Sequence, residues 1–581
     1  MNSPLRLAAL LLVATLAIYY PVLSADFVNL DDIDMLLAHD TRDEPLQLGK
    51  LFFPPTTARY YRPLHILSFH LDHSIWQQEP SGYHLTNYIL HAINSLLLFA
   101  ILLSLLPRLH LEQNLALPGA LLFALHPLTC ESVAWISGRT DIIASLFCLA
   151  AFRFYLATHW LRYPAVFAGL LLGLLAKESA AALIPIVLLT DWAMGVQAGK
   201  NLRQNTKSCA TWILNFLPAL LIYAWMRMGG VSGIDHGLQG AISNKVAAEG
   251  GTIAQGIGSY LLHFCAAVAF YIKKLFIPLP LNVAIYQISV WPYFFLFLGL
   301  VAVVAYFLVK KKYPIPFWLA LMAASFSPAL LVATSKMAWT PFAERYLYLS
   351  CAVWAVAIVL AVASLSRVLL PRGALLRPLL WALIGLWGAA TLQRTFVWHN
   401  DLSIWEATMA HAPNFGKALY KYGTALASSG KKEEGLRVFQ RAVEVARNED
   451  WKWYSLISLG DNARAEKRPN EALAYYRQAL AIKADHYSHS ALGNFYITAL
   501  AKSPTEKEEL IEKAFFHYRE AYNQKHDPFY LYTIANKQLE IAPGAAQSTF
   551  LEILDNHPRS KYANYSHIIL KRLKNKEQSD Q

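Results

Sequence analysis

The sequence is poor in charge. Only 15% of its 581 residues are Asp, Glu, Lys or Arg, whereas 55% are hydrophobic and the mean hydropathy is +0.31. Soluble domains carry about 25% charged residues, so the composition argues against an ordinary soluble protein and favours a polytopic membrane protein. The five cysteines form no C-x-x-C pair and most lie in apolar runs, which indicates neither a disulfide framework nor a thiolate metal site.

Other familiar patterns are missing as well. No G-x-x-x-x-G-K-[ST] loop is present, so nucleotide hydrolysis is not indicated. The net charge is +12, but no dense basic patch interleaved with aromatic residues appears, and we expect no nucleic-acid partner. No pair of broken helices recurs at matching positions, which weakens a transporter interpretation. Lys and Arg instead lie in short runs between apolar segments, as membrane topology requires.

The composition changes sharply near residue 396. Residues 1–396 contain apolar runs long enough to cross a bilayer core of about 30 Å, and residues 397–581 show polar helical patterning. We therefore predict an all-α protein with a polytopic membrane domain followed by a helical domain. The predicted spans, eleven in number, are 5–22, 85–106, 115–130, 140–158, 163–177, 180–196, 209–227, 291–309, 316–334, 346–366 and 378–396.

The distribution of Lys and Arg predicts the orientation of these spans. The positive-inside rule places the N-terminus in the cytoplasm, and eleven crossings send residues 397–581 to the outer face. Segment 257–277 is predicted to be an interfacial or re-entrant helix, with Lys273 and Lys274 near head groups, because a crossing there would put "VKKKY" outside. The first apolar run is read as a retained helix; the alternative is a signal peptide cleaved near "LSA" at 23–25.

The polar C-terminal part repeats itself. The segments "RVFQRAVEV" at 437–445, "AYYRQALAI" at 474–482 and "FHYREAYNQ" at 516–524 share one pattern. Each follows a glycine, and these glycines are predicted to mark the crossings of paired helices: Gly423, Gly460 and Gly493. Such units resemble tetratricopeptide (TPR) repeats, which stack into a solenoid that binds peptide or protein. The alternative is an unrelated helical bundle.

Ionisable side chains gather at the predicted outer turns. Groups of this kind are expensive at membrane depth and are functional candidates by default. Purely structural roles are the alternatives: packed histidines, a snorkelling lysine, a structural ion pair, or a helix that ends at "HP". However, the outer turns carry both carboxylates and cations, whereas the inner turns carry mainly cations. The residues are Asp31, Asp32 and Asp34 after the first span; Arg62, His65, His70, His84, Asn87 and His91 around the second; and His126, Glu131, Arg139, Asp141, Lys177, Glu178, Glu344 and Arg345 further on.

This set of side chains suits chemistry at the bilayer surface. An aspartate can abstract a proton, and Arg and Lys at membrane height suit a phosphate. A donor with a lipid tail in the membrane and a phosphate at its surface fits that arrangement. The outer side of the membrane domain is therefore the predicted site.

The motifs resemble those of a known family. "NLDD", "YYRPLHILSFHLD", "YHLTNYILHAINSLLL", "FALHPLTCESVAWISGRTDIIASLF", "LLAKESA" and "ERYLYLS" occur in the order seen in the transmembrane and tetratricopeptide-repeat-containing (TMTC) proteins. Those are O-mannosyltransferases of the GT-C membrane fold with a lumenal repeat domain. The most specific part is "HP-x-x-x-E" followed by "GR-x-D". This chain has fewer repeats than the animal members.

The resemblance implies roles for the residues that match. The first-loop acid, Asp31 or Asp32, would accept the proton of the acceptor hydroxyl, with Asp31 slightly favoured, and Glu131 would orient the base or acceptor. The resemblance requires no cofactor; a divalent metal between Asp31, Asp32 and Glu131 is the alternative. The cations assigned to the donor phosphate are Arg139, Lys177 and Arg345, and the residues assigned to the acceptor or to supporting roles are Arg62, His84, His126, Asp141, Glu178 and Glu344.

The sequence thus predicts an inverting membrane glycosyltransferase. It would move mannose or another hexose from a polyprenyl phosphate to Ser or Thr of exported proteins, with the repeats helping to bind the acceptor. The small size favours a bacterial relative in the cytoplasmic membrane; in a eukaryote the membrane would be that of the endoplasmic reticulum. Two alternatives are a lipid or cell-wall glycan as acceptor, and a non-catalytic, membrane-anchored assembly factor.

Overall fold

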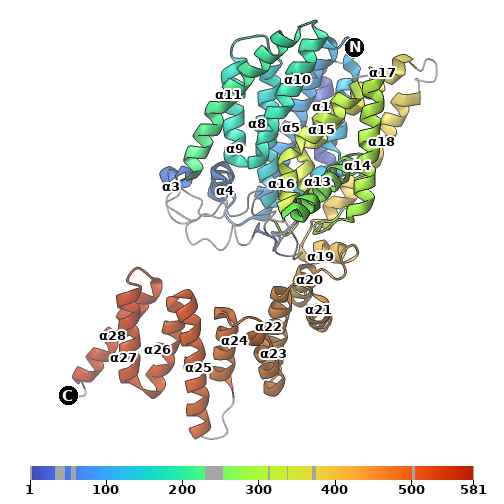
Figure 1. Cartoon of the computed structure of the whole chain (residues 1–581). Helices are drawn as coiled ribbons and strands as arrows, with labels where there is room; N and C mark the ends of the chain where they lie inside the picture. Colours follow the sequence, from blue (N-terminus) through green and yellow to red (C-terminus); the bar gives the residue numbers. More distant parts are fainter. Residues whose placement is uncertain are drawn as a thin grey trace. The chain divides into compact units, whose positions relative to one another are not determined.

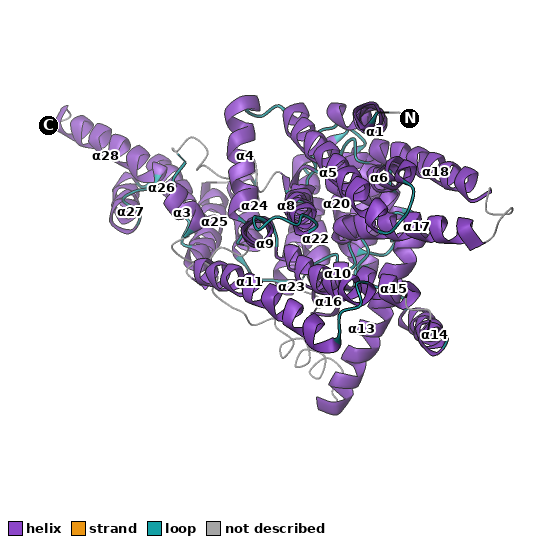
Figure 2. Ribbon diagram, turned by 90° about the horizontal axis from the view of Figure 1, so that it is seen from above, coloured by secondary structure: helices purple, strands orange, loops and turns teal. Residues whose placement is uncertain are grey.

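The computed structural model describes residues 3–32, 46–53, 61–228, 253–311, 314–335, 338–368, 375–499 and 504–579. Asp34 and part of the first outer loop lie outside these ranges. The described residues form helices and no strands, as Figure 2 shows, which confirms the predicted all-α class. The chain divides into two compact units, Met1–Thr408 and Met409–Gln581. In the sequence, the boundary between the two units at Thr408 and Met409 lies twelve residues beyond the predicted boundary at 396.

The first unit is a bundle of mainly apolar helices. The first helix shows how local sequence sets an end: Ser3 caps it through a hydrogen bond from the backbone of Arg6, and Pro4 occupies its first turn. The α-helices (α) and 3-10 helices (η) are α1 Pro4–Tyr19, η1 Tyr20–Ser24, α3 Leu48–Phe52, α4 Pro63–Trp76, α5 Pro80–Arg108, η3 Gln113–Leu115, α6 Ala116–Ala124, η4 Pro127–Thr129, α7 Cys130–Ala134, η5 Ile136–Gly138, α8 Arg139–Tyr155, α9 Arg162–Ala176, η6 Glu178–Ala182, α10 Leu183–Gln197, α11 Leu202–Met228, α13 Ile253–Phe276, α14 Val290–Val309, α15 Pro314–Ser325, α16 Ser327–Ser335, η7 Glu344–Leu347, α17 Tyr348–Val368, α18 Leu376–Val397 and α19 Asp401–Met409.

The long helices of this unit run side by side, and α3 and α4 lie at the end of the bundle opposite the marked N-terminus (Figure 1). Within the described ranges, seven helices are long and apolar enough to cross a membrane, or up to nine if each of two bent pairs counts as one span. That is fewer than the eleven predicted. The predicted spans 115–130 and 316–334 are each broken, with bends of 47° and 55°, and α9 has only 15 residues. The predicted spans 140–158 and 378–396, which correspond to α8 and α18, are also not among the seven, whereas α13 is.

The break between α6 and α7 lies in the middle of the bundle. Every residue from Leu115 to Ser145 is buried. Irregular backbone at membrane depth must find internal partners. Here the Thr391 hydroxyl donates to the carbonyl of Leu125 at 2.8 Å, and the backbone N–H of Leu128 donates to Nδ1 of His126 at 3.2 Å. His126 is thus a cap for the broken helix, and its Nε2 lies 3.2 Å from the carbonyl oxygen of Leu275.

Lys274 is paired inside the protein. Its side chain is 4% exposed and forms an ion pair of 2.7 Å with Glu344, so its ammonium group faces a carboxylate of this chain. Nζ of Lys274 also donates to the carbonyl oxygens of Pro278 and Pro280. Helix α13, which carries this lysine, is itself long and apolar enough to be a candidate span.

The second unit consists of paired helices. An ideal Cβ on each repeat glycine would lie 2.6–2.9 Å from an aromatic ring of the partner helix: Phe439 against Gly423, Tyr476 against Gly460 and Tyr518 against Gly493. Only glycine admits such close crossings, which confirms the predicted role of these residues. The helices are α20 Gly416–Ser428, α21 Lys432–Val445, α22 Glu449–Ala465, α23 Pro469–Ile482, α24 His486–Thr498, α25 Pro504–Lys525, α26 Pro528–Ile541, α27 Pro543–Asn556 and α28 Lys561–Ser579.

Candidate active site

The two first-loop acids have different surroundings. The carboxylate of Asp32 is fully buried and accepts hydrogen bonds from the backbone N–H and hydroxyl of Ser137 and from the backbone N–H of Val28. Burial raises the pKa of Asp32 from its ordinary value to about 7, and the hydrogen bonds from Ser137 and Val28 oppose that rise. Asp32 therefore fastens the first loop to η5.

Asp31 is only partly buried, and its side chain forms no hydrogen bond or ion pair within the described ranges. The loop that carries it is nevertheless held on both sides. The backbone N–H of Asp26 donates to the carbonyl of His399 at 2.9 Å, and that of Asn29 donates to the Asp401 carboxylate at 2.7 Å. Asp31 is thus a carboxylate with an accessible face on a fixed backbone, which suits the predicted base.

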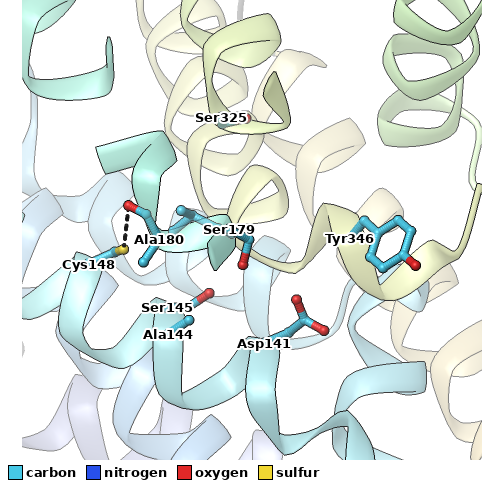
Figure 3. A pocket seen from close by; sticks show the side chains of 9 residues that line it. Asp141, Ala144, Ser145, Cys148, Ser179, Ala180, Ser325 and Tyr346 are labelled. Atoms are coloured by element: carbon cyan, nitrogen blue, oxygen red, sulfur yellow. Dashed lines mark hydrogen bonds between the residues drawn. The ribbon is translucent and has the colours of Figure 1, made fainter. Parts of the chain in front are cut away.

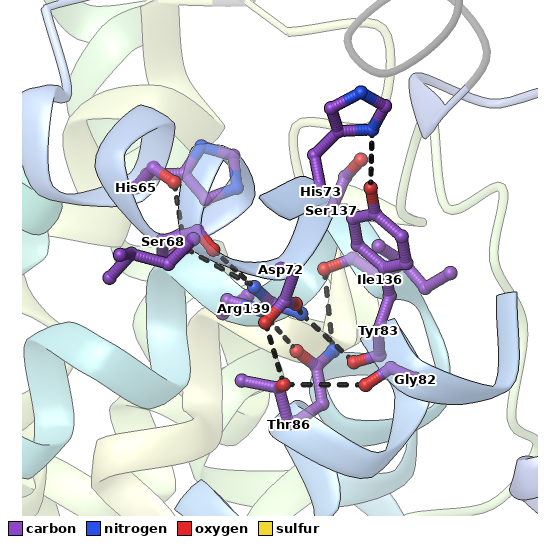
Figure 4. A network of polar contacts seen from close by, with 12 residues as sticks. His65, Ser68, Asp72, His73, Gly82, Tyr83, Thr86, Ile136, Ser137 and Arg139 are labelled. Carbon is purple, nitrogen blue, oxygen red and sulfur yellow. Dashed lines mark hydrogen bonds and ion pairs between the residues drawn. The ribbon is translucent and has the colours of Figure 1, made fainter. Parts of the chain in front are cut away.

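Arg139 is fully buried in a network that joins α4, α5 and α8 (Figure 4). Its Nη2 lies 2.5 Å from the Asp72 carboxylate and donates to the carbonyl of Tyr83 at 2.9 Å. Its Nε donates to the side chain of Asn87 at 2.5 Å, and its guanidinium lies over the Phe69 ring at 4.8 Å. Arg139 therefore holds the first-loop helix against the bundle, because its donors are already engaged within this chain.

Asn87 shapes the segment before Arg139. Its amide donates to the carbonyls of Val133, Trp135 and Ile136 at 3.0–3.4 Å, where the chain passes from α7 into η5. Gly138 is required at the end of the turn, since a Cβ there would lie 2.9 Å from the carbonyl oxygen of Ser132. The motif "GR-x-D" is thus built around a tight turn.

Two ion pairs meet at the ring of Tyr346. Lys177 contacts both oxygens of Asp141 at 2.6 Å, and Arg345 contacts Glu131 at 2.5 Å. The Lys177 ammonium and the Arg345 guanidinium lie 5.1 Å and 5.0 Å from the Tyr346 ring centroid. Burial lowers the pKa of Lys177 to about 8, and Asp141 opposes that shift. These five side chains, called the tyrosine cluster below, come from α7, α8, η7 and the end of α9.

A third group lies next to this cluster. The Glu178 carboxylate contacts Arg62 and Arg227, each at 3.4 Å, and all three side chains are partly exposed. Glu344, although next to Arg345 in sequence, pairs with Lys274 instead. His84 is buried beside the backbone of Ala25 and Asp26.

Most of the predicted site residues thus lie close together, but not as one array of free cations. The described residues contain no group of three His, Cys, Asp or Glu side chains around one point, and the carboxylates of Asp32 and Glu131 have separate partners. The predictions did not include Asp72, Arg227, Lys274 and Tyr346. Asp72 and Tyr346 stand inside quoted motifs, whereas Arg227 had no signal beyond its place at the end of an apolar run.

A small pocket opens beside the tyrosine cluster (Figure 3). Its cavity volume is about 10 Å³, room for about one water molecule. Asp141 and Tyr346 from the cluster line it together with three hydroxyl groups, those of Ser145, Ser179 and Ser325. Hydroxyl-lined walls next to an ion pair offer hydrogen bonds to a polar ligand.

Comparisons with known proteins agree with this picture. A tetratricopeptide repeat model matches residues 415–485, which confirms the repeats. The mouse protein O-mannosyl-transferase TMTC3 is 33% identical over 148 residues, which are 24% of this chain and 15% of the relative. The human protein O-mannosyl-transferase TMTC1 is 34% identical over 163 residues, or 26% and 18%. The Caenorhabditis elegans protein O-mannosyl-transferase F38B6.6 is 28% identical over 194 residues, which are 32% of this chain and 28% of the relative.

The chain is similar to the TMTC protein O-mannosyl-transferases. The match spans less than a third of the length of each of these three relatives. It bears out the resemblance of the motifs to this family. Together with the apolar helices, it also indicates a membrane protein.

Proposed function

We propose that this chain is a membrane glycosyltransferase that moves mannose, or another hexose, from a polyprenyl-phosphate donor to Ser or Thr of exported proteins. The similarity to TMTC transferases supports the protein acceptor. The observation that carries the proposal is the pair of first-loop acids: one carboxylate is buried and anchored, and its neighbour has an accessible face. The ionisable side chains that the motifs single out lie at the ends of several helices around them.

The reaction is a single displacement. The carboxylate of Asp31 accepts the proton of the acceptor hydroxyl while the oxygen attacks the anomeric carbon. The bond between that carbon and the phosphate oxygen breaks, the configuration inverts, and polyprenyl phosphate leaves with the electron pair. Cations near the phosphate stabilise the charge that develops on it, and Lys177 and Arg345 are the cations to which we assign this role. Glu131 holds Arg345, and Asp141 holds Lys177.

The topology belongs to the same proposal. The N-terminus lies in the cytoplasm, and the repeat unit and Asp31 share the outer side of the membrane, as the positive-inside rule predicts. The repeat unit binds exported proteins and presents their hydroxyl groups. The close helix crossings at its repeat glycines support a stack of repeats, and such a stack offers a surface for this binding.

Glycopeptide mass spectrometry of exported proteins tests the proposal. Cells would carry the wild type, a deletion, Asp31→Asn, or the control Glu112→Gln, which removes an exposed carboxylate paired with Arg377. Loss of a hexose-sized adduct in the deletion and in Asp31→Asn, but not in Glu112→Gln, is expected. An unchanged protein profile with altered lipids or glycans would contradict the protein acceptor. Full function of Asp31→Asn in every other phenotype of the deletion would favour the assembly factor.

A further inference from the structure

One buried cation of the first unit lacks a partner. The Lys and Arg side chains that are more than nine-tenths buried in the described part of the chain are Arg139, Lys177, Lys274 and Arg394. The first three form ion pairs with Asp72, Asp141 and Glu344. Arg394, in the last turn of α18, is only 5% exposed, and its guanidinium group forms no ion pair or hydrogen bond with any residue of the described ranges.

Such an arginine is costly to bury. The loss of its hydration is not repaid by a partner, which is why buried charges in proteins are normally paired. The positive charge of Arg394 acts on Glu131, but that carboxylate is already held by Arg345 at 2.5 Å. Ionisable groups at membrane depth are functional candidates by default, and an arginine that stabilises no partner is a stronger candidate than a paired one.

Arg394 lies at one end of an aromatic stack. Its guanidinium group is 6.0 Å from the ring centroid of Trp398. The Trp398 ring stacks on that of Trp135, with centroids 6.3 Å apart and planes at 20°. At the other end, the Arg345 guanidinium lies 4.9 Å from the centroid of Trp135. Two stacked indoles therefore stand between two guanidinium groups, and one of these, Arg345, is a cation that the motifs assign to the donor phosphate.

The stack contains further donors without an acceptor. Nη2 of Arg394 and the Nε1 atoms of Trp135 and Trp398 are all buried, and none has a hydrogen-bond partner within the described ranges. The hydroxyl of Ser132, three residues before Trp135, is in the same condition there. Guanidinium and indole N–H groups can only donate. This group of side chains therefore needs an acceptor, and an anionic oxygen satisfies both the charge and the N–H groups.

Helix α18 places the stack where apolar surface gives way to polar sequence. Exposed apolar side chains continue along this helix as far as Phe396, after Leu379 and Leu386, and the polar segment "HND" follows at 399–401. Phe396 is two residues beyond Arg394. A guanidinium group at this height matches the head group of a lipid whose chain lies against the apolar surface of the helix.

The same segment holds the first loop. The carbonyl oxygen of His399 accepts a hydrogen bond from the backbone N–H of Asp26, and the carboxylate of Asp401 accepts one from the backbone N–H of Asn29. The loop that carries Asp31 is thus fastened to residues that follow Arg394 directly in the chain. A phosphate at Arg394 therefore lies in the part of the molecule that holds the proposed base.

We propose that Arg394, together with the indole N–H groups of Trp135 and Trp398, binds the phosphate of the lipid-linked sugar donor. This inference rests on the proposed function for the identity of the lipid. The planar guanidinium fork matches two phosphate oxygens at once. Lys177 and Arg345 share their charge with carboxylates of the chain, whereas the charge of Arg394 is balanced only by the ligand.

The test measures binding rather than transfer. Full-length protein in phosphatidylcholine nanodiscs would be titrated with a polyprenyl phosphate that carries no sugar, and bound lipid would be counted by native mass spectrometry. Arg394→Met is expected to weaken binding at least about tenfold, since it removes charge-assisted hydrogen bonds. Arg377→Gln is the matched control, because this exposed arginine lies in the first turn of the same helix. Equal affinity in the wild type and Arg394→Met would overturn the proposal.

The stability of the lipid-free variants separates binding from a structural role. Loss of an unpaired buried charge should leave the unfolding temperature of Arg394→Met unchanged or raise it, whereas loss of a structural anchor would lower it. Trp398→Phe is the second variant: it keeps a ring against Trp135, removes only the N–H group, and should weaken binding about threefold to tenfold. If Arg394→Met does not fold, unchanged affinity in Trp398→Phe overturns the proposal by itself.

A phosphatidylglycerol titration forms the other arm. That lipid carries a phosphate but no isoprenoid chain. Weaker binding of phosphatidylglycerol than of polyprenyl phosphate is expected, and equally tight, Arg394-dependent binding would contradict a donor site.

The outcomes separate this site from the proposed reaction. Arg394-dependent binding of polyprenyl phosphate without any glycopeptide would support the site and contradict protein glycosylation. Glycopeptides together with unchanged lipid binding in Arg394→Met would support the reaction and overturn the site.

Discussion

Replacing Asp72 by Asn tests whether the network around Arg139 supports the site. Asn keeps the size of the side chain and a partner for Thr86, whose hydroxyl donates to Asp72 at 2.8 Å, but it removes the charge 2.5 Å from Arg139. The two side chains are 0% and 6% exposed. Loss of one partner of a buried pair costs about 3–5 kcal/mol, because the remaining charge stays desolvated.

The lower part of that range, about 3 kcal/mol, is the better expectation here. Arg139 keeps Asn87, the Tyr83 carbonyl and the Phe69 ring as partners after the substitution. Membrane proteins commonly unfold irreversibly, so the assay is the rate of thermal inactivation in detergent. A loss of 3 kcal/mol in the barrier speeds inactivation about a hundredfold.

Two further variants make the test decisive. Arg377→Gln breaks an exposed pair, 47% and 58% exposed, and should change stability by less than about 1 kcal/mol. Arg139→Met combined with Asp72→Asn removes both charges and should be less damaging than the sum of the single substitutions. An inactivation rate for Asp72→Asn equal to that of the wild type would refute the assignment of Arg139 as a buried anchor.

Three other predictions follow from the structure. In the folded protein the pKa of Asp32 is raised from 3.8 to about 7, so the stability that Asp32 contributes is complete below pH 4 and is lost as the pH rises through 7. In Asp32→Asn the unfolding temperature should therefore change less with pH between these two values. The same pH dependence in the variant and the wild type would contradict the raised pKa. The pKa of Lys177 is lowered to about 8, so polyprenyl phosphate affinity should decline above pH 8, and Lys177→Arg should abolish that decline in the same titration. Gly460→Ala forces a Cβ to 2.6 Å from the ring of Tyr476 and should destabilise by about 1–3 kcal/mol, whereas Gly544→Ala, with open space around it, should not; equal unfolding temperatures would argue against the crossing.

The sequence was sufficient to predict the all-α class and the repeats. The repeated segments and the glycine that precedes each of them predict paired helices. Charged residues at the ends of apolar runs predict side chains near the membrane surface. The tyrosine cluster is made from such positions, and so is the group of Glu178, Arg62 and Arg227.

Which carboxylate pairs with which cation could not be predicted from the sequence. Glu344 and Arg345 are adjacent, yet one binds Lys274 and the other binds Glu131. Side chains at neighbouring positions of a helical turn point in different directions, so adjacency is a poor guide to partners. The adjacent residues Lys177 and Glu178 also have different partners: Lys177 pairs with Asp141, and Glu178 pairs with the two arginines.

The number of membrane spans could not be predicted from composition alone either. A hydropathy window sums apolar residues and does not register the break after Leu125, although "HP" at 126–127 marks it. The burial of Lys274 depends on its ion pair with Glu344, which lies seventy positions away in the sequence. Only the folded chain brings such partners together.

The buried stretch from Leu115 to Ser145 has a consequence for how this protein can change over time. A residue with an outward face can be exchanged with little effect, but this stretch has no such residue. Almost any substitution there alters packing or leaves a backbone group unsatisfied. Selection should therefore tolerate the least drift in this stretch, and it is the part of the chain by which remote descendants of the same ancestor would still be recognised.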